Sequence, residues 1–334
     1  MLFRKNMAYE NKEYNVILEF FLVSIFSVFF WFITGLFDGS GFGTDMGRYF
    51  SIYANSISDK FDLDGILYIF SGRLADPFNF LIQYFFKVIG FSFYFFLLLV
   101  IFFYYKAAAY RLNNLFGKRV WILQLFTLSS YSLFLIPSVY VALRQGISIL
   151  FIFFFCIHTI NEKIGSKKFY KELFIVIFAS FLHLSSIIII PFIFLKKIFK
   201  KYIKLFNILF FSIFVFYSTG LIYKFGFYFS SLDLSEYSFY LRSFTLTPEG
   251  GNYYEVGPTI KKSLSIILPI LLIEITKKYY TNHQKIKIEP ITLFYKYISI
   301  LTMLLSNLPY NDRVLMFGWA FIPVMLSLPF YLTL

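Results

Sequence analysis

The side chains best suited to chemistry in this sequence are arginines near the ends of apolar stretches. Arg144 opens the stretch LRQGISILFIFFF and is followed directly by Gln145. A guanidinium offers a planar fork of donors that matches the oxygens of phosphate and carboxylate groups. Arg144 therefore predicts a binding position for an anion, and Gln145 adds an amide beside it. The alternative is an arginine whose charge extends to a membrane surface.

Two further segments place an arginine close to a carboxylate. The segment GTDMGRYF holds Asp45 and Arg48, and the turn NDR between the last two apolar stretches holds Asp312 and Arg313. A carboxylate at the outer surface is a candidate general base for an attacking hydroxyl, and a nearby arginine can orient it. The plainer interpretation is a surface ion pair, which stabilises a protein by at most about 1 kcal/mol. The sequence leaves both interpretations open.

A histidine adds a second candidate for proton transfer. His183 is the ionisable residue of the apolar stretch 173–195, and Ser185 and Ser186 follow it. Imidazole exchanges protons near neutral pH, and an ionisable group inside a membrane is a functional hypothesis by default. A histidine that bonds one helix to another in a membrane gives the same pattern. Both interpretations remain.

The composition predicts that helices in a membrane position these residues. Of 334 residues, 59% are hydrophobic and 15% are charged, whereas about a quarter of an ordinary soluble domain is charged. Apolar runs occupy residues 16–36, 91–109, 120–137, 144–160, 204–223, 263–276, 291–308 and 314–332. A bilayer crossing takes about 20 residues and must be helical. We therefore predict an all-α, polytopic membrane protein with about 8 to 10 transmembrane helices, one or two of them re-entrant or broken, in a single domain over residues 1–334.

Two stretches do not fit simple crossing helices. Residues 76–90 are amphipathic and contain Lys87, which indicates a helix that lies at the membrane surface or re-enters it. The stretch 173–195 has lysines on both sides, and lysine-rich flanks favour the cytoplasm. Two half-helices broken near His183–Ser186 would keep both flanks on that side. One ordinary span with a basic outer loop is the alternative.

The distribution of positive charge predicts an anion site on the outer face. The net charge is +13, which in a soluble protein would favour nucleic acid as partner. In a polytopic protein, lysines instead mark the cytoplasmic loops. If the N-terminus lies in the cytoplasm, most lysines lie on the cytoplasmic side, whereas Arg48, Arg144 and Arg313 lie on the outer side. The loops at about 37–76 and 224–261 also lie on the outer side in this topology. The single cysteine excludes a disulfide framework within the chain.

Four of these segments together resemble a known family. The segments are GTDMGRYF, DPFNFLIQYFFKVIG, ALRQGISI and FASFLHLSSIIIIPF. In this order and spacing they resemble the EpsG-like branch of bacterial polysaccharide polymerases, which is similar to the Wzy-type O-antigen polymerases. The resemblance runs from about residue 40 to 195 and extends weakly to the NDR turn. It departs from the expected pattern at Asp76-Pro77, where a glutamate is expected and the carboxylate has a shorter reach.

The resemblance implies a membrane glycosyltransferase on the outer face of the bacterial cytoplasmic membrane. It would join oligosaccharide repeat units carried on undecaprenyl diphosphate, for O-antigen, capsule or exopolysaccharide, with no metal and no other cofactor. Its partners would be this lipid-linked oligosaccharide, membrane lipids, a chain-length regulator and a flippase, and not nucleic acid. A lipid-linked oligosaccharide flippase is the alternative, because intramembrane charges and broken helices also suit transport.

On this basis each candidate residue receives a role. Catalysis by proton transfer is assigned to Asp45 and His183. Binding of the diphosphate is assigned to Arg144, Arg313 and Arg48. Binding of the acceptor sugar is assigned to Asp76, Gln145 and Asp312.

Overall fold

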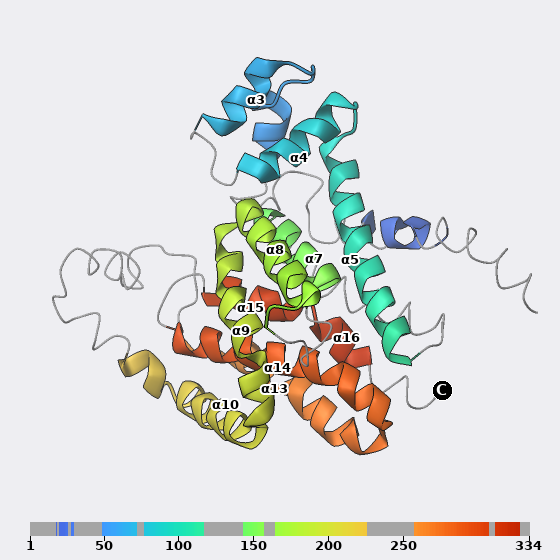
Figure 1. The fold of residues 1–334 in the computed structure, drawn as a ribbon. Coiled ribbons are helices and arrows are strands. Elements are labelled where there is room, and N and C mark those ends of the chain that lie inside the picture. Colours follow the sequence, from blue (N-terminus) through green and yellow to red (C-terminus); the bar gives the residue numbers. More distant parts are fainter. Residues whose placement is uncertain are drawn as a thin grey trace, which may run out of the picture. The chain divides into compact units, whose positions relative to one another are not determined.

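The computed structural model describes residues 49–71, 77–116, 143–156, 164–225, 257–306 and 311–327, with a few positions between 18 and 29. These residues form helices and no strand (Figure 1), which confirms the prediction of an all-α protein. The contacts divide the chain into two compact units. Unit 1 is residues 1–154 with 176–187, and unit 2 is residues 155–175 with 188–334. The single domain predicted from the sequence stays a prediction.

At least three described helices of unit 1 contact α4. The described helices of this unit include the π-helical turn η2 (Ile52–Ser56), α3 (Leu63–Phe70), α4 (Pro77–Val88), α5 (Phe93–Phe116) and α7 (Leu143–Phe155), of which α3, α5 and η2 contact α4. Residues 176–187, from α8 and the turn that follows it, also belong to this unit. Lys87 of α4 donates to the carbonyl oxygens of Tyr53, Ala54 and Ile57, at 2.6, 2.9 and 2.6 Å. A cation at a helix C-terminus satisfies carbonyls that have no partner within the helix. Lys87 therefore fixes η2 against α4.

A sharp corner joins α4 to α5. Gly90 has a positive φ of 89°, its N–H donates to Lys87 O, and the N–H of Phe91 donates to Phe86 O. This bond pair is the Schellman ending of a helix, which favours glycine at the left-handed position. The two helices are bent by 119° relative to each other. The corner agrees with the prediction that residues 76–90 form a separate amphipathic helix.

The described helices differ in their fitness to cross a bilayer. None of them alone is both long enough and apolar enough for a crossing. The helix α4 and the Phe93–Ala107 part of α5 meet that requirement only together, across their corner. Most of the predicted span 16–36 and all of the span 120–137 lie outside the described residues. Membrane crossing thus stays a prediction for the individual spans.

The stretch 173–195 is broken where the sequence predicted. The helix α8 (Lys167–Leu182) ends before His183, a 3-10 turn η3 covers Leu184–Ile189, and α9 (Ile190–Lys201) follows. Pro191 stands at the start of α9, where its missing N–H costs nothing and its fixed φ suits a first helical turn. The prediction of two half-helices, rather than one continuous helix, is confirmed at the level of secondary structure.

The remote ends of α8 and α9 lie together within unit 2. The rings of Phe169 and Phe194 are 5.2 Å apart, and Glu172 forms a buried ion pair with Lys196. Each pair joins residues at a similar distance in sequence from His183. These ends of the two helices therefore run antiparallel, as the arms of a hairpin do.

In unit 2 the other helices gather around α14. They are α10 (Ile203–Ser218), α13 (Ile260–Thr276), the turn η5 (Lys277–Tyr279), α14 (Asn282–Leu304), α15 (Asn311–Trp319) and α16 (Ile322–Ser327). Residues 290–300 of α14 are all buried. The ring of Phe294 contacts Phe192 of α9 at 5.1 Å and Phe321 at 5.2 Å. The core of unit 2 thus lies along the second half of α14.

Three boundaries predicted from the sequence were wrong. A capping box of Thr281 and Gln284 starts α14 well before residue 291, because these side chains satisfy the first backbone donors. The NDR segment is the first turn of α15 and not a turn between helices, since Asn and Asp favour helix starts. The predicted span 314–332 is interrupted between α15 and α16, where Pro323 has no N–H to continue the helix.

Candidate functional site

Arg144 binds a tyrosine that lies 95 residues earlier in the chain. Its Nε donates to the hydroxyl of Tyr49 at 2.8 Å, and its guanidinium carbon lies 5.5 Å from the centre of the Tyr49 ring. Tyr49 is 2% exposed, and Arg144 is half-buried at the start of α7. A hydrogen bond and a cation–π contact to one ring fix the orientation of the guanidinium plane. Arg144 is thereby preorganised, as an anion-binding residue must be.

The contacts of unit 1 bring together the four segments that carry the family resemblance. The Arg144–Tyr49 bond joins ALRQGISI to GTDMGRYF. The ring of Tyr49 then contacts Phe80 of α4 at 6.3 Å. The four segments are far apart in the sequence, so this convergence is a property of the fold.

The fourth segment, FASFLHLSSIIIIPF, contacts both α4 and α7. Phe78 of α4 contacts Phe181 of α8, with ring centres 5.4 Å apart. Ser186 Oγ donates to Ser148 Oγ of α7 at 3.0 Å, and both hydroxyls are buried. Each segment therefore contacts two of the others within unit 1. We call this arrangement the four-motif cluster.

His183 lies at the break between α8 and η3. Its Nδ1 is 2.7 Å from the hydroxyl of Ser185, and the backbone N–H of Ser185 points at the same nitrogen at 3.3 Å. These bonds occupy Nδ1 and fix the ring. Nε2 can accept a proton only in the tautomer whose Nδ1–H donates to Ser185 Oγ. When Nδ1 instead accepts from the Ser185 N–H, Nε2 carries the ring proton and is a donor. The catalytic role of His183 and its structural alternative both stay open.

Gln145 is completely buried next to Arg144. The carbonyl of the following residue, Gly146, accepts a hydrogen bond from the buried Tyr104 hydroxyl of α5. These contacts tie the first turn of α7 to α5. The Gln145 side chain is therefore inside unit 1 and not on an open surface. Its role in binding an acceptor sugar stays a prediction.

A buried amide pair in α4 was missed by sequence reasoning. Gln83 Nε2 donates to Asn79 Oδ1 at 2.6 Å, and both side chains are fully buried. Among the residues that the structure describes, Asn79 Nδ2 and Gln83 Oε1 have no hydrogen-bond partner. One donor and one acceptor side by side match a hydroxyl or a water molecule, which is both. The spacing of four residues in an amphipathic stretch was the available signal.

The remaining predicted site residues are placed only in part. Asp45, Arg48 and Asp76 lie outside the described residues. The backbone of Asp312 is in the first turn of α15, and Arg313 is half-buried beside it. Arg313 belongs to unit 2, whereas Arg144 belongs to unit 1. Joint binding of one diphosphate by both arginines therefore stays a prediction.

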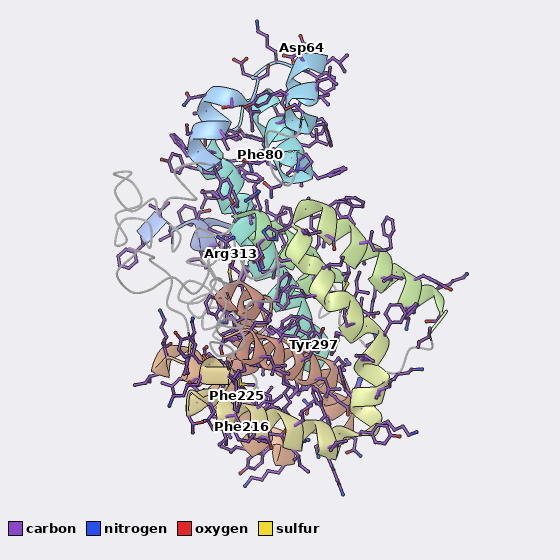
Figure 2. All side chains as sticks on the ribbon, turned by 90° about the vertical axis from the view of Figure 1, so that its left-hand side faces the viewer. Asp64, Phe80, Phe216, Phe225, Tyr297 and Arg313 are labelled. Atoms are coloured by element: carbon purple, nitrogen blue, oxygen red, sulfur yellow. The ribbon has the colours of Figure 1, made fainter. Side chains whose placement is uncertain are left out.

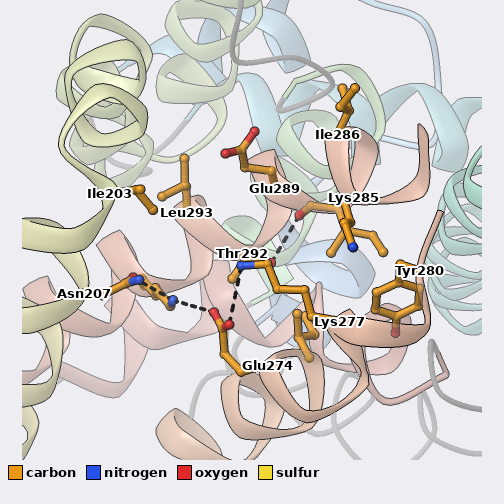
Figure 3. Close-up of a pocket in the computed structure, with 13 residues that line it drawn as sticks. Ile203, Asn207, Glu274, Lys277, Tyr280, Lys285, Ile286, Glu289, Thr292 and Leu293 are labelled. Carbon is orange, nitrogen blue, oxygen red and sulfur yellow. Dashed lines mark hydrogen bonds and ion pairs between the residues drawn. The ribbon is translucent and has the colours of Figure 1, made fainter. Parts of the chain in front are cut away.

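Unit 2 contains a second buried polar cluster that sequence reasoning also missed. Lys296 Nζ donates to Asn207 Oδ1 at 2.9 Å and to Glu274 Oε1 at 3.2 Å (Figure 3). Lys296 and Glu274 fall within the predicted spans 291–308 and 263–276. The rule that singled out His183, an ionisable group in an apolar span, applied equally to them.

Comparisons with known proteins give one match. The model of the EpsG family matches residues 20–334, which include the four-motif cluster, most of unit 1 and all of unit 2. Neither the curated proteins nor the solved structures gave a match. In the described part of the chain, no group of three His, Cys, Asp or Glu side chains is arranged to hold a metal ion.

Proposed function

Because the chain belongs to the EpsG family, we propose that it is a polymerase of lipid-linked oligosaccharide repeat units. The family indicates a polysaccharide-polymerase-like function in a membrane-embedded protein. The finer proposal is a glycosyltransferase that works at the outer face of the bacterial cytoplasmic membrane. Its substrate is an oligosaccharide carried on undecaprenyl diphosphate.

The observation that carries the proposal is the convergence of four segments beside Arg144. Tyr49 and Ser186 bond to Arg144 and Ser148 in the first half of α7, and Phe80 contacts the Tyr49 ring. Packing alone needs no arginine at this place, and a half-buried cation carries a desolvation cost. An anionic substrate group that binds Arg144 gives a reason for that cost.

The chemistry proposed is transfer of the growing glycan to a hydroxyl of the next unit. The hydroxyl oxygen attacks the anomeric carbon, the bond from that carbon to the diphosphate oxygen breaks, and undecaprenyl diphosphate leaves. Arg144 stabilises the charge that develops on the diphosphate, where a preorganised donor is most effective. The hydroxyl proton goes to Asp45, or to Nε2 of His183 in the tautomer whose Nδ1–H donates to Ser185 Oγ.

Exposed apolar side chains support the membrane location. Along α13, Ile260, Leu264, Leu268, Leu271 and Ile275 are exposed at intervals of three or four residues. They form one continuous apolar stripe, and Ile275 is 67% exposed. Neighbouring α10 exposes several more, among them Phe216, which projects from the helix in Figure 2. Large exposed apolar surfaces mark a contact with lipid or with another protein.

The hairpin of α8 and α9 supports the orientation. The Glu172–Lys196 pair holds the two lysine-rich ends together, and lysine-rich ends favour the cytoplasmic side. His183 lies at the opposite end of α8. In this orientation the break points toward the outer half of the membrane, where the proposed reaction takes place.

The proposal is tested by the length of the surface glycan in a strain that lacks this gene. We expect single repeat units on the surface, with long chains restored by the wild-type gene and not by Arg144→Ala. The variant must reach the membrane in normal amount, which an epitope tag measures. Loss of all surface glycan, with lipid-linked units trapped in the cytoplasmic leaflet, would favour the flippase and refute the polymerase.

A further inference from the structure

A pocket in unit 2 opens between α10, the end of α13 and the first half of α14. Its volume is about 150 Å³, enough for a group of several atoms. Its charged lining consists of Glu274, Lys277, Lys285, Glu289 and Lys296 (Figure 3). No residue of the four-motif cluster lines it. The pocket therefore needs an explanation of its own.

The inner end of the pocket is a buried ammonium group. The Lys296 side chain is 2% exposed and bonds to Glu274 and Asn207. The other oxygen of the Glu274 carboxylate is 3.5 Å from Lys277 Nζ. One carboxylate thus faces two ammonium groups. It neutralises one of their two charges.

Lysines outnumber carboxylates around the whole pocket. Glu289 pairs at 2.8 Å with Lys200, which does not itself line the pocket. The charge of Glu289 is therefore balanced by Lys200 and not by a lysine of the lining. The Lys285 ammonium has no partner among the residues that the structure describes, although it lines the pocket. With Lys200 included, four lysines stand against two glutamates, an excess of two positive charges.

The helical register directs the polar side chains of α14 into the pocket. Lys285, Glu289, Thr292 and Lys296 follow one another at intervals of three or four residues and all line it. Such spacing places side chains on one face of a helix. The face presents ammonium groups at both ends, with the Glu289 carboxylate and the Thr292 hydroxyl between them. The Thr292 hydroxyl donates to Ile288 O at 3.2 Å. Lysines around a hollow with a hydroxyl are a common arrangement for phosphate.

We propose that this pocket binds a phosphate group, either the headgroup of an anionic lipid or a free phosphate ion. The singly or doubly charged anion would sit between Lys277, Lys285 and Lys296 and offset the excess positive charge. Basic pockets between membrane helices bind lipid headgroups in this way. The inference is separate from polymerisation, because it requires neither Arg144 nor a turnover of substrate.

The test measures binding to the purified full-length protein in detergent. Inorganic phosphate is titrated at constant ionic strength, with chloride as the reference anion, and the melting temperature is recorded. A second arm incubates the protein with phosphatidylcholine vesicles, with or without phosphatidic acid, and identifies the retained lipid by native mass spectrometry. Lys285→Gln removes a charge without breaking an ion pair. Lys278→Gln is the matched control, since Lys278 is exposed and does not line the pocket.

We expect phosphate to raise the melting temperature of the wild type and of Lys278→Gln. The apparent phosphate affinity should fall about tenfold in Lys285→Gln, because a charge-assisted hydrogen bond is lost. Selective retention of phosphatidic acid would identify the lipid as the source of the phosphate, and a response to the free ion alone would identify phosphate itself. No response to either probe, or equal losses in Lys285→Gln and Lys278→Gln, would overturn the proposal.

Discussion

At the scale of single residues, the function depends on how Arg144 is held. The Tyr49 hydroxyl accepts its Nε–H, and the Tyr49 ring lies beneath the guanidinium. Arg144 was predictable from the sequence as a cation in an apolar stretch. Its partner was not, because no local pattern connects residues so far apart in the chain.

Replacing Tyr49 by Phe tests this positioning role. The ring and its contact with Phe80 are kept, and the hydrogen bond to Arg144 is removed. We expect a loss of about 1 kcal/mol in transition-state stabilisation, or roughly fivefold in the rate of chain extension. The effect should be on kcat more than on KM, since the bond orients a group that acts in the transition state. Equal changes after Tyr53→Phe would show that the loss is not specific.

A second prediction at this scale concerns pH. The Ser58 hydroxyl and then the Gly65 N–H donate to the Asp62 carboxylate, which caps α3, and they lower its pKa below the ordinary value of 3.8. A lowered pKa in the folded state stabilises the protein above the ordinary pKa. That contribution is lost as the pH falls through the folded-state pKa.

The melting temperature as a function of pH measures this contribution. Asp62→Ala should melt below the wild type at neutral pH, and the difference should shrink as the pH falls below about 4. Asp64→Ala, in the first turn of the same helix, is the control. A difference that stays constant down to acidic pH would contradict the assignment.

At the scale of elements, the hairpin of α8 and α9 was predictable and the ends of α14 and α15 were not. Lysines on both sides of 173–195 made a turn near His183 one of two interpretations, and α8 does end there. Hydropathy alone marked 291 as a helix start, because it does not register a capping box at Thr281. Capping and proline effects act on single backbone groups, so an average over an apolar window misses them.

The buried ion pair at the base of the hairpin should be essential to its stability. Removing one partner of such a pair leaves an uncompensated buried charge and costs about 3 to 5 kcal/mol. Lys196→Met should therefore lower the melting temperature strongly. The double variant Lys196→Met with Glu172→Leu should recover most of the loss, because it buries no charge. Additive losses in the double variant would mean that the two side chains do not depend on each other.

Cysteine labelling tests the orientation of the same hairpin. Cys156 is the only cysteine in the sequence, and Cys156→Ser provides a background for Lys168→Cys and Lys201→Cys. Both new thiols should react with a membrane-impermeant maleimide only after the cells are opened. If one thiol were labelled from outside and the other only from inside, the hairpin with both ends in the cytoplasm would be wrong. The alternative that the sequence also allowed, a single crossing helix, would then hold.

At the scale of the whole molecule, the family match extends over both units, whereas the four motifs converge within unit 1. The resemblance seen in the motifs ended mostly at residue 195, and the family match continues to residue 334. After residue 195 the sequence offers few recognisable motifs, because α13 and α14 consist mainly of apolar residues. Their polar contacts, such as Lys296 with Asn207, become visible only when three helices are assembled.

The most direct test of the polymerase account is chain extension by the purified protein. The wild type is reconstituted in vesicles with its undecaprenyl-diphosphate-linked repeat unit. Two quantities are measured: the length of the glycan product and the amount of undecaprenyl diphosphate that the reaction releases. Arg144→Gln should lower the rate roughly 10- to 150-fold, as expected for one lost charge-assisted contact in the transition state. Lys106→Gln, in α5 of the same unit, should extend chains at the wild-type rate. Equal rates for the wild type and Arg144→Gln, with normal folding of both, would contradict a polymerisation site centred on Arg144.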